Sequence, residues 1–538
     1  MMKPKIKKYI LIILPLLFVI VACLFHFNIG SFYQLAADPE YSILFNGAVI
    51  GRGSLAINFI DHPATPLIYI SGIAIRLGHL FTGEESYVID FLNDPEWYLN
   101  FASILNMLVI GFMAFWSGKK LLKFQNGLWI AFILQIGLFI NASLIEISAR
   151  LIPESTMIIP VILLSVLLIK YIKKDAEENN YKRITWQFSA IVAFGIACKL
   201  SFTPMLLIPL ILFRKNFKAI LQLVWKTILL TCLFAYPIIT NPSESFEWIS
   251  NIFLHSGKHG TEASDFINTN EFSTNIGIII KRDAWFWVLL LGQFALSFTS
   301  KNKRLKEASL AITISLMAIL FFTLKHFAIH YIMPFYAFKT LFVVFIIFAL
   351  QENKKLKAIT KLNQKIRIAA AILIIVLISP QLIEVKNHYD YSTKRKEKEN
   401  TIQKKVLSQI LNNELPLIVD APYWGTPFPE YAKAYGFMNT HRRKTTFKDE
   451  LRELHPNFYC YVPWSENFNH WDKFVGFDYI LKDSKACYLY TNQNIGSTKR
   501  IIERLNNSKI KYELFLLYEN RDTGESLFVI DTSNKEIQ

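Results

Sequence analysis

Cysteine is scarce in this chain, and its distribution excludes several kinds of protein. The 538 residues include five cysteines, and none has the cysteine or histidine spacing of a zinc site. A disulfide-built secreted scaffold is also excluded, because such domains are short and dense in cysteine. Cys460 and Cys487 share the C-terminal segment, and the sequence leaves open whether they form a disulfide.

Negative charge is also in short supply. Asp and Glu number 42 against 58 Lys and Arg, which gives a net charge of +16. The basic residues occur in short clusters between apolar runs, which is the pattern of membrane topology, and we expect no nucleic-acid partner. The sequence contains no internal repeat and no low-complexity tract.

Apolar residues, in contrast, are abundant. They make up 52% of the chain, and the mean hydropathy is +0.30, which is typical of a polytopic membrane protein. Runs of about 17 to 25 apolar residues can cross a bilayer as helices. We predict eleven transmembrane helices, at 8–27, 97–117, 126–145, 152–172, 184–199, 202–213, 218–239, 284–300, 308–325, 330–350 and 368–384. The short pair 184–199 and 202–213 could instead be a hairpin that does not fully cross.

Charge predicts how these helices are oriented. The loops near residues 3–8, 119–123, 170–183, 214–218, 301–306 and 354–367 are basic, and they alternate with the acidic loop 28–96 and the long loop 237–283. Because basic loops stay in the cytoplasm, the first outer loop and the C-terminus are predicted to be extracytoplasmic. Richness in Ile, Lys, Asn and Phe suggests a bacterium, and hence its inner membrane.

The composition changes after residue 384. Short β-rich runs occur at 417–420, 458–462, 477–481, 511–518 and 526–530, with a helical stretch at 497–507. We therefore predict a transmembrane domain over 1–384 and a small extracytoplasmic α/β domain over 385–538.

The first outer loop carries the residues best suited to chemistry. Between residues 28 and 96 there are eight acidic and two basic side chains. Asp38 and Glu40 flank Pro39, which fixes φ and disfavours a helix interior, so both carboxylates lie on a constrained turn. They could serve as a general base or hold a metal; a solvated acidic loop is the alternative. The following segment 66–81 could lie on the membrane surface or pack on the bundle.

Several cations are predicted at the outer helix ends. His62 lies in an Asp-His-Pro segment that could contact a phosphate, although the same residues are a helix-start signal. Other candidates for binding an anion are Arg150, Lys199, Lys258, Lys325 and His330. Lys199 could instead extend to lipid headgroups, and Lys258 could belong to a flexible polar loop.

An acidic residue after the first span, then Tyr41, then His62-Pro63-x-x-Pro66-Leu67 before an apolar helix resembles the GT-C membrane glycosyltransferases. The likeness is closest to the protein O-mannosyltransferase and lipid A aminoarabinose transferase type, and it covers residues 8–384. It implies a GT-C-like helical domain and an inverting transfer of a sugar from a polyprenyl-phosphate donor to an envelope glycan, lipid or protein.

The resemblance also implies roles for residues. Asp38 corresponds to the family's catalytic base, with Glu40 as the second candidate, and the six cations above are candidates for binding the donor phosphate. No cofactor is certain, and a divalent metal is possible.

Two other functions stay open. A flippase for lipid-linked glycans would carry charges within its spans, whereas an O-antigen-ligase or polymerase would depend on the loop 237–283.

Overall fold

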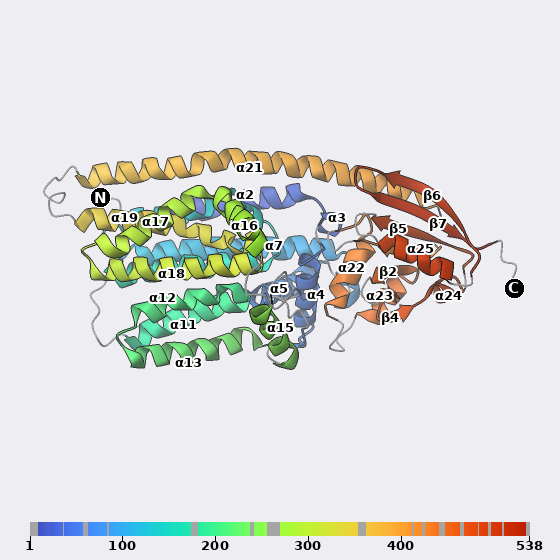
Figure 1. Cartoon of the computed structure of the whole chain (residues 1–538), viewed down its shortest axis with the longest axis horizontal. Helices are drawn as coiled ribbons and strands as arrows, with labels where there is room; N and C mark the ends of the chain where they lie inside the picture. Colours follow the sequence, from blue (N-terminus) through green and yellow to red (C-terminus); the bar gives the residue numbers. More distant parts are fainter. Residues whose placement is uncertain are drawn as a thin grey trace. The chain divides into compact units, whose positions relative to one another are not determined.

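The structure is a computed structural model. It describes residues 9–35, 37–57, 63–82, 86–173, 181–236, 242–255, 269–352, 362–411, 414–421, 425–440, 447–462, 467–482, 484–492, 497–507 and 510–533. The chain forms two compact units (Figure 1). One comprises Met1–His26, Ile60–Ile70 and Ser103–Tyr389, and the other comprises Phe27–Phe59, Ser71–Ala102 and Asp390–Gln538.

The first unit is a helical bundle. The helices that lie wholly or mostly in it are α2 (Ile13–Ile29), α7 (Pro95–Leu121), α8 (Gly127–Ile136), α9 (Ala142–Ser148), α10 (Pro153–Lys173), α11 (Tyr181–Cys198), α12 (Leu207–Leu212), α13 (Phe217–Phe234), α15 (Pro242–Leu254), α16 (Thr269–Arg282), α17 (Ala284–Thr299), α18 (Lys303–Lys325), α19 (Phe338–Glu352) and α21 (Leu362–Gln409).

Helices lie in the described parts of all eleven predicted segments, but the predicted number of spans is not confirmed. Within the described residues, six helices are long and apolar enough to cross a membrane. A seventh crossing is possible where α8 and α9 are joined by a 74° bend. The segments 8–27, 202–213 and 284–300 correspond to shorter apolar helices, so composition alone does not make them full spans.

The local sequence explains the central helix of the bundle. Helix α10 begins with Pro153 and Glu154 and ends with Lys170 and Lys173. Proline suits the first turn, and these charges complement the helix dipole at both ends. The most apolar stretch of α10 is 83% buried, whereas the corresponding stretch of α13 is only 22% buried. Helix α10 therefore lies inside the bundle and α13 at its periphery.

In the second unit, the first outer loop packs against the C-terminal segment. Helix α4 (Glu40–Gly51) is buried on almost every side, and α22 (Pro429–Met438) packs across it. Gly436 permits this contact, because a Cβ atom there would lie 2.5 Å from the Phe45 ring and 2.9 Å from the Tyr41 carbonyl oxygen. Helices α3 (Phe32–Leu35) and α6 (Tyr87–Asn93) also contact helices of the C-terminal segment, namely α22 and α23 (Lys448–Leu454).

The C-terminal segment forms a seven-stranded sheet in the order β4-β3-β2-β1-β5-β7-β6. The strands are β1 (Leu417–Asp420), β2 (Phe458–Val462), β3 (Asn467–His470), β4 (Lys473–Val475), β5 (Ala486–Asn492), β6 (Glu513–Asn520) and β7 (Glu525–Asp531). Strand β1 pairs in parallel with β2 and β5, and the other pairs are antiparallel. Helix α25 (Ser497–Asn507) packs Ile501 and Leu505 into the core of this sheet.

The sheet confirms much of the predicted α/β domain and corrects one strand. Strands are present at four of the five predicted runs, and α25 matches the predicted helix. The prediction for 477–481 is wrong, because α24 (Phe477–Ile480) begins there after Gly476. Strands β3, β4 and β5 were not predicted.

Cys460 and Cys487 do not form a disulfide. Both thiols are free and buried, and strand β1 lies between their strands in the sheet. Neighbouring strands are about 4.8 Å apart, so residues on strands β2 and β5 are too far apart for a bridge.

A predicted domain boundary and a predicted apolar segment each lie within one continuous helix. Residue 384 lies inside α21, which runs without a break through the charged segment 394–405. The apolar segment 66–81 lies within α5 (Thr65–Thr82), which exposes Ile73, Leu77 and Leu80.

Candidate active site

The two predicted carboxylates of the first outer loop differ sharply in accessibility. Asp38 is exposed in the turn that precedes α4, and its peptide bond to Pro39 is cis. Glu40 is the first residue of α4 and is 0% exposed. Because a general base must reach the proton that it removes, Asp38 is the better placed of the two.

Glu96 accepts hydrogen bonds from residues on both sides of this turn. Its Oε1 accepts a hydrogen bond of 2.5 Å from the Phe32 amide, and its Oε2 accepts one of 2.7 Å from the Tyr41 hydroxyl. Phe32 precedes Asp38 and Tyr41 follows it, so one carboxylate fixes the chain on either side. Burial and the nearby Glu96 raise the pKa of Tyr41 well above its usual value, so the phenol stays protonated and donates.

In the helical unit, Lys199 and Glu154 form a buried ion pair. Lys199 follows the last residue of α11 in extended backbone and begins a short 3₁₀ helix, and its side chain meets Glu154 in the first turn of α10. The exposed fractions of Lys199 and Glu154 are 4% and 2%. Breaking such a pair by removing one partner typically costs about 3–5 kcal/mol, because the other charge stays buried.

His330 and Tyr331 complete this cluster. His330 Nε2 lies 3.6 Å from a Glu154 oxygen, and the His330 side chain is 47% exposed. The Lys199 ammonium lies 4.0 Å from the centre of the Tyr331 ring. The cluster therefore combines a buried carboxylate, two groups that can carry positive charge, and an aromatic face. Lys199 and His330 can together donate hydrogen bonds to an anion that reaches His330.

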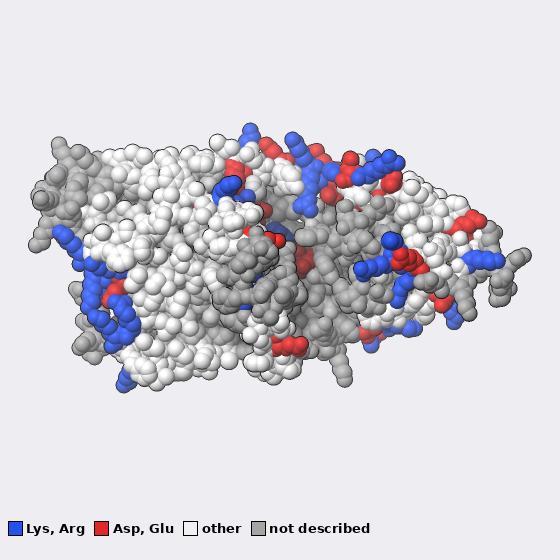
Figure 2. All heavy atoms as spheres, in the orientation of Figure 1, with Lys and Arg blue, Asp and Glu red and all other residues white. Residues whose placement is uncertain are grey.

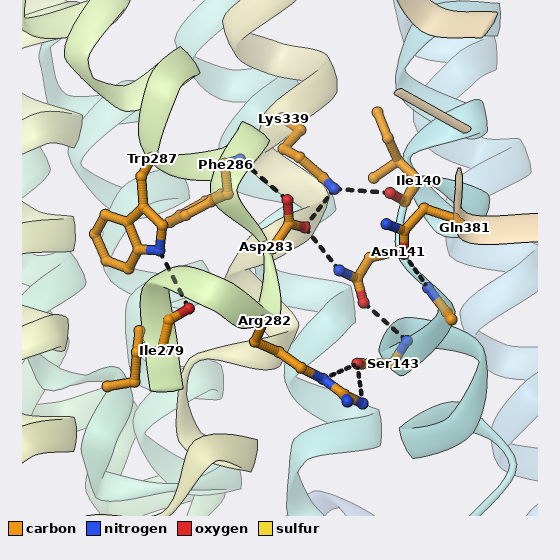
Figure 3. Close-up of polar contacts among 11 residues, drawn as sticks. Ile140, Asn141, Ser143, Ile279, Arg282, Asp283, Phe286, Trp287, Lys339 and Gln381 are labelled. Atoms are coloured by element: carbon orange, nitrogen blue, oxygen red, sulfur yellow. Dashed lines mark hydrogen bonds and ion pairs between the residues drawn. The ribbon is translucent and has the colours of Figure 1, made fainter. Parts of the chain in front are cut away.

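A second buried ion pair joins Asp283 to Lys339, and it differs in kind. Figure 3 shows the Lys339 ammonium directed at both Asp283 and the Ile140 carbonyl oxygen, which is 2.7 Å away. The other Asp283 contacts are Asn141 Nδ2 at 2.7 Å and the Phe286 amide at 3.1 Å. Both charges are thus held by neighbouring groups of the bundle, which indicates a structural joint between α17, α19 and the start of α9.

The remaining predicted cations have separate placements. Lys325 is buried at the end of α18, and Arg150 is half-buried in the turn before α10. His62 and Lys258 lie outside the described residues. Of the six predicted cations, the structure therefore brings Lys199 and His330 together on Glu154.

Sequence reasoning missed Glu154, Glu96 and the Asp283–Lys339 pair. Glu154 and Glu96 look like ordinary acidic residues of a first helical turn. Lys339 gave a usable signal, because a lone lysine inside an apolar run is expensive and calls for a partner.

Within the part of the chain that the structure describes, no three His, Cys, Asp or Glu side chains gather as a metal site. His62 and His259 are outside that part.

Comparisons with known proteins agree at the level of fold. No family model matches the chain, and no curated protein matches it. Two solved structures match over 97% of this chain and 99% of theirs, with 11% sequence identity. They are ArnT from Cupriavidus metallidurans bound to undecaprenyl phosphate, with a TM-score of 0.53, and the same protein in the apo state, with a TM-score of 0.52.

This chain has the fold of ArnT. The coverage extends over the helical unit and the C-terminal sheet alike, so the fold predicted from the GT-C resemblance is confirmed. With its long apolar helices and this fold, the chain is an integral membrane protein.

Proposed function

We propose that this protein is an inverting glycosyltransferase that moves a sugar from a polyprenyl-phosphate donor to an acceptor hydroxyl. The observation that carries the proposal is the cluster of Lys199, Glu154 and His330 in a chain with the fold of ArnT. A solved structure of ArnT contains undecaprenyl phosphate, a lipid phosphate of the class expected to carry the donor sugar.

The role assigned to the cluster is to hold the phosphate of the donor. Glu154 pairs with the Lys199 ammonium in buried surroundings, so the ammonium is held in position before an anion arrives. His330 is half-exposed beside it and can add a second cation when protonated. Arg150, Lys325, His62 and Lys258 remain further candidates for the same phosphate.

Asp38 is assigned the role of general base, with Glu40 second. The acceptor oxygen attacks the anomeric carbon, its proton passes to the Asp38 carboxylate, and the bond from that carbon to the phosphate oxygen breaks. The phosphate leaves with the electron pair, and it is stable as an anion, so no general acid is needed. Inversion follows from a single displacement. The assignment of Asp38 and Lys199 to one reaction rests on their complementary chemistry.

The proposal extends to location and acceptor. Basic loops alternate with acidic ones along the sequence, which supports an orientation with the first loop and the C-terminal segment outside. Richness in Ile, Lys, Asn and Phe supports a bacterial inner membrane. The acceptor is then an envelope glycan, lipid or protein.

The test is sugar transfer by the purified full chain from a labelled polyprenyl-phosphate-sugar extract. Asp38→Asn is expected to lower transfer by about 10²-fold or more, in keeping with the loss of a general base, while carrier binding is kept. Glu40→Gln should transfer normally if it is correctly folded. Transfer by Asp38→Asn at the wild-type rate would contradict the assignment of the base.

Carrier binding tests the phosphate site separately. Lys199→Met should weaken binding of undecaprenyl phosphate by about 10-fold or more, because a charge-assisted contact is lost. Lys303→Met removes the same charge from an exposed position of α18 and should bind as the wild type does. Equal effects of the two variants would argue against the cluster. Carrier binding without transfer to any tested acceptor would favour a flippase.

A further inference from the structure

Lys226 is a buried lysine on a peripheral helix. Only 22% of the apolar stretch of α13 is buried, yet Lys226 in this helix is itself almost completely buried, with 2% of its surface exposed. Its ammonium donates to Thr185 Oγ1 at 2.9 Å and to Gln222 Oε1 at 3.3 Å, and it lies 3.5 Å from the Lys182 carbonyl oxygen. All three acceptors are neutral oxygens on α11 and α13.

Two tryptophans enclose the same ammonium. Its distance to the ring centre is 4.9 Å for Trp186 and 5.8 Å for Trp225. The two rings meet edge to face at 5.8 Å, and they are 36% and 46% exposed. Partly exposed tryptophans beside a cation are typical of the boundary between acyl chains and headgroups.

Lys226 differs from the buried lysines Lys199 and Lys339 in the kind of partner that it contacts. Lys199 and Lys339 each have a carboxylate partner. Among the residues that the structure describes, the contacts of Lys226 are the neutral oxygens and rings named above, and Lys182 adds a second positive charge nearby. Two cations around polar oxygens favour an anion.

The direction of the side chain gives the depth of the site. Lys226 is nine positions after Phe217, the first residue of α13, and therefore about 13 Å along the helix. Its ammonium, however, lies at the first turn of α11, beside Lys182 and Thr185. The side chain thus extends back toward the end of the helix pair, as lysines do near a membrane surface.

That end of the bundle is basic, and the wall of α13 beside it is apolar. Figure 2 shows Lys and Arg gathered at the end of the bundle where α11 and α13 begin. Leu221 and Ile228 on α13 are 58% and 59% exposed, so the helix offers a surface for acyl chains next to the cations.

We propose that the exposed Lys182 contacts the phosphate headgroup of an anionic phospholipid, with the buried Lys226 adding positive charge behind it and Trp186 and Trp225 flanking the headgroup. The lipid is drawn from the leaflet at the basic end of the bundle, and its acyl chains lie along α13. This site is separate from the Lys199 cluster and does not depend on the proposed transfer reaction.

The test is native mass spectrometry of the purified full chain titrated with phosphatidylglycerol. Lys226→Met should weaken binding of the tightest lipid by about five- to tenfold, the value expected for one lysine near a headgroup. Lys226→Arg should keep the binding. Lys218→Met is the matched control, because it removes the same charge from an exposed position of α13. Equal weakening by Lys226→Met and Lys218→Met would overturn the proposal, since general attraction would then explain the binding.

Competing ligands separate the possible sources of phosphate. Phosphatidylcholine and inorganic phosphate should not displace the bound phosphatidylglycerol, whereas displacement by inorganic phosphate alone would overturn the assignment to a lipid. Displacement by undecaprenyl phosphate at equal concentration would also overturn it, and would point to a carrier site instead.

Tryptophan quenching tests the site without altering Lys226. Brominated phosphatidylglycerol in nanodiscs should quench the wild type more than brominated phosphatidylcholine does. The difference should disappear in the double variant Trp186→Phe and Trp225→Phe. A difference that survives in the double variant would contradict the proposed location.

Discussion

At the scale of single residues, accessibility separates side chains that the sequence treats alike. Asp38 and Glu40 are two positions apart, and only Asp38 is exposed. The sequence predicted Lys199 and His330 as candidates because a leaving phosphate needs cations at the outer membrane face. It could not supply their common partner, Glu154, since pairing of the ends of α10 and α11 depends on tertiary packing.

Glu96 is expected to position Asp38 through the two hydrogen bonds described above. Glu96→Gln leaves one acceptor oxygen where two are used, so the Phe32 and Tyr41 contacts cannot both be kept. We expect transfer to fall by about two- to tenfold with carrier affinity unchanged, since one hydrogen bond is worth about 0.5–1.5 kcal/mol. Steady-state transfer kinetics with a parallel binding measurement would check this.

Asp94→Asn is the control. Asp94 is a neighbouring carboxylate that accepts a hydrogen bond from the Trp97 amide, whereas Glu96 accepts those from Phe32 and Tyr41. A loss of carrier affinity in Glu96→Gln equal to the loss of transfer would show a general structural defect instead.

His455 should make the stability of the protein depend on pH. Burial, together with the positive charge of Lys433, lowers the pKa of His455 to about 4. Lys433 Nζ lies 3.0 Å from its Nε2, and this outweighs the Glu430 carboxylate at 3.7 Å from Nδ1. The unfolded chain, with a pKa near 6.5, binds a proton that the folded chain rejects, so stability is complete above about pH 6.5 and is lost toward pH 4.

The expected contribution is about 2–3 kcal/mol, from a shift of roughly two pKa units at a partly exposed group. His455→Gln should flatten the free energy of unfolding between pH 4 and 6.5, as measured by denaturant titration of the purified chain. Parallel pH profiles for wild type and variant would refute the contribution of His455.

At the scale of elements, predictions succeeded where a pattern was local. Strand β1, strand β2 and helix α25 have the predicted bounds, because both strands are short continuous apolar runs and α25 has apolar residues at helical spacing. The hairpin of β3 and β4 was missed because its turn is Trp471-Asp472, with φ angles of 42° and 88°. Asn-Gly or Asp-Gly is the usual signal for such a turn. Here, Trp471 is instead held by burial and by a 3.0 Å hydrogen bond from its ring to the His455 carbonyl oxygen.

The contact of α22 with α4 depends on the absence of a side chain at Gly436. Gly436→Ala would place a methyl group 2.5 Å from the Phe45 ring and 2.9 Å from backbone oxygen, so one helix must shift. Overpacking of this kind costs about 1–3 kcal/mol. We expect a lower melting temperature in thermal unfolding of the purified chain.

Gly476→Ala serves as the comparison, since a Cβ atom there meets nothing within 4 Å. Its melting temperature should stay near that of the wild type. If both variants melt at the wild-type temperature, the packing of α22 against α4 is not as close as described.

At the scale of the whole molecule, the sequence predicted a polytopic protein whose C-terminal segment is α/β, and both features are present. The sequence did not indicate that the first outer loop and the C-terminal segment would form one compact unit. The residues that join them, such as Ser42 and Asn439 with a 2.8 Å hydrogen bond, are almost 400 positions apart. Only an alignment of related sequences or a structure reveals contacts of that range.

Orientation in the membrane is a prediction for the entire chain. In a Cys232→Ser background, which removes the exposed native thiol, a cysteine at Asp478 should react with an impermeant maleimide added to intact cells. A cysteine at Lys303 should react only after the cells are opened. Both positions are exposed, so the opposite pattern of labelling would reverse the predicted topology.

The free state of all five cysteines has a consequence for how the protein can be produced. Burial raises the pKa of Cys460 and of Cys487 to about 12, so neither thiol is a ready nucleophile for oxidation or exchange. A domain predicted to face the oxidising side of the membrane thus matures without thiol chemistry. Its folding yield should be indifferent to disulfide-forming enzymes, to reducing agents and to the presence of oxygen.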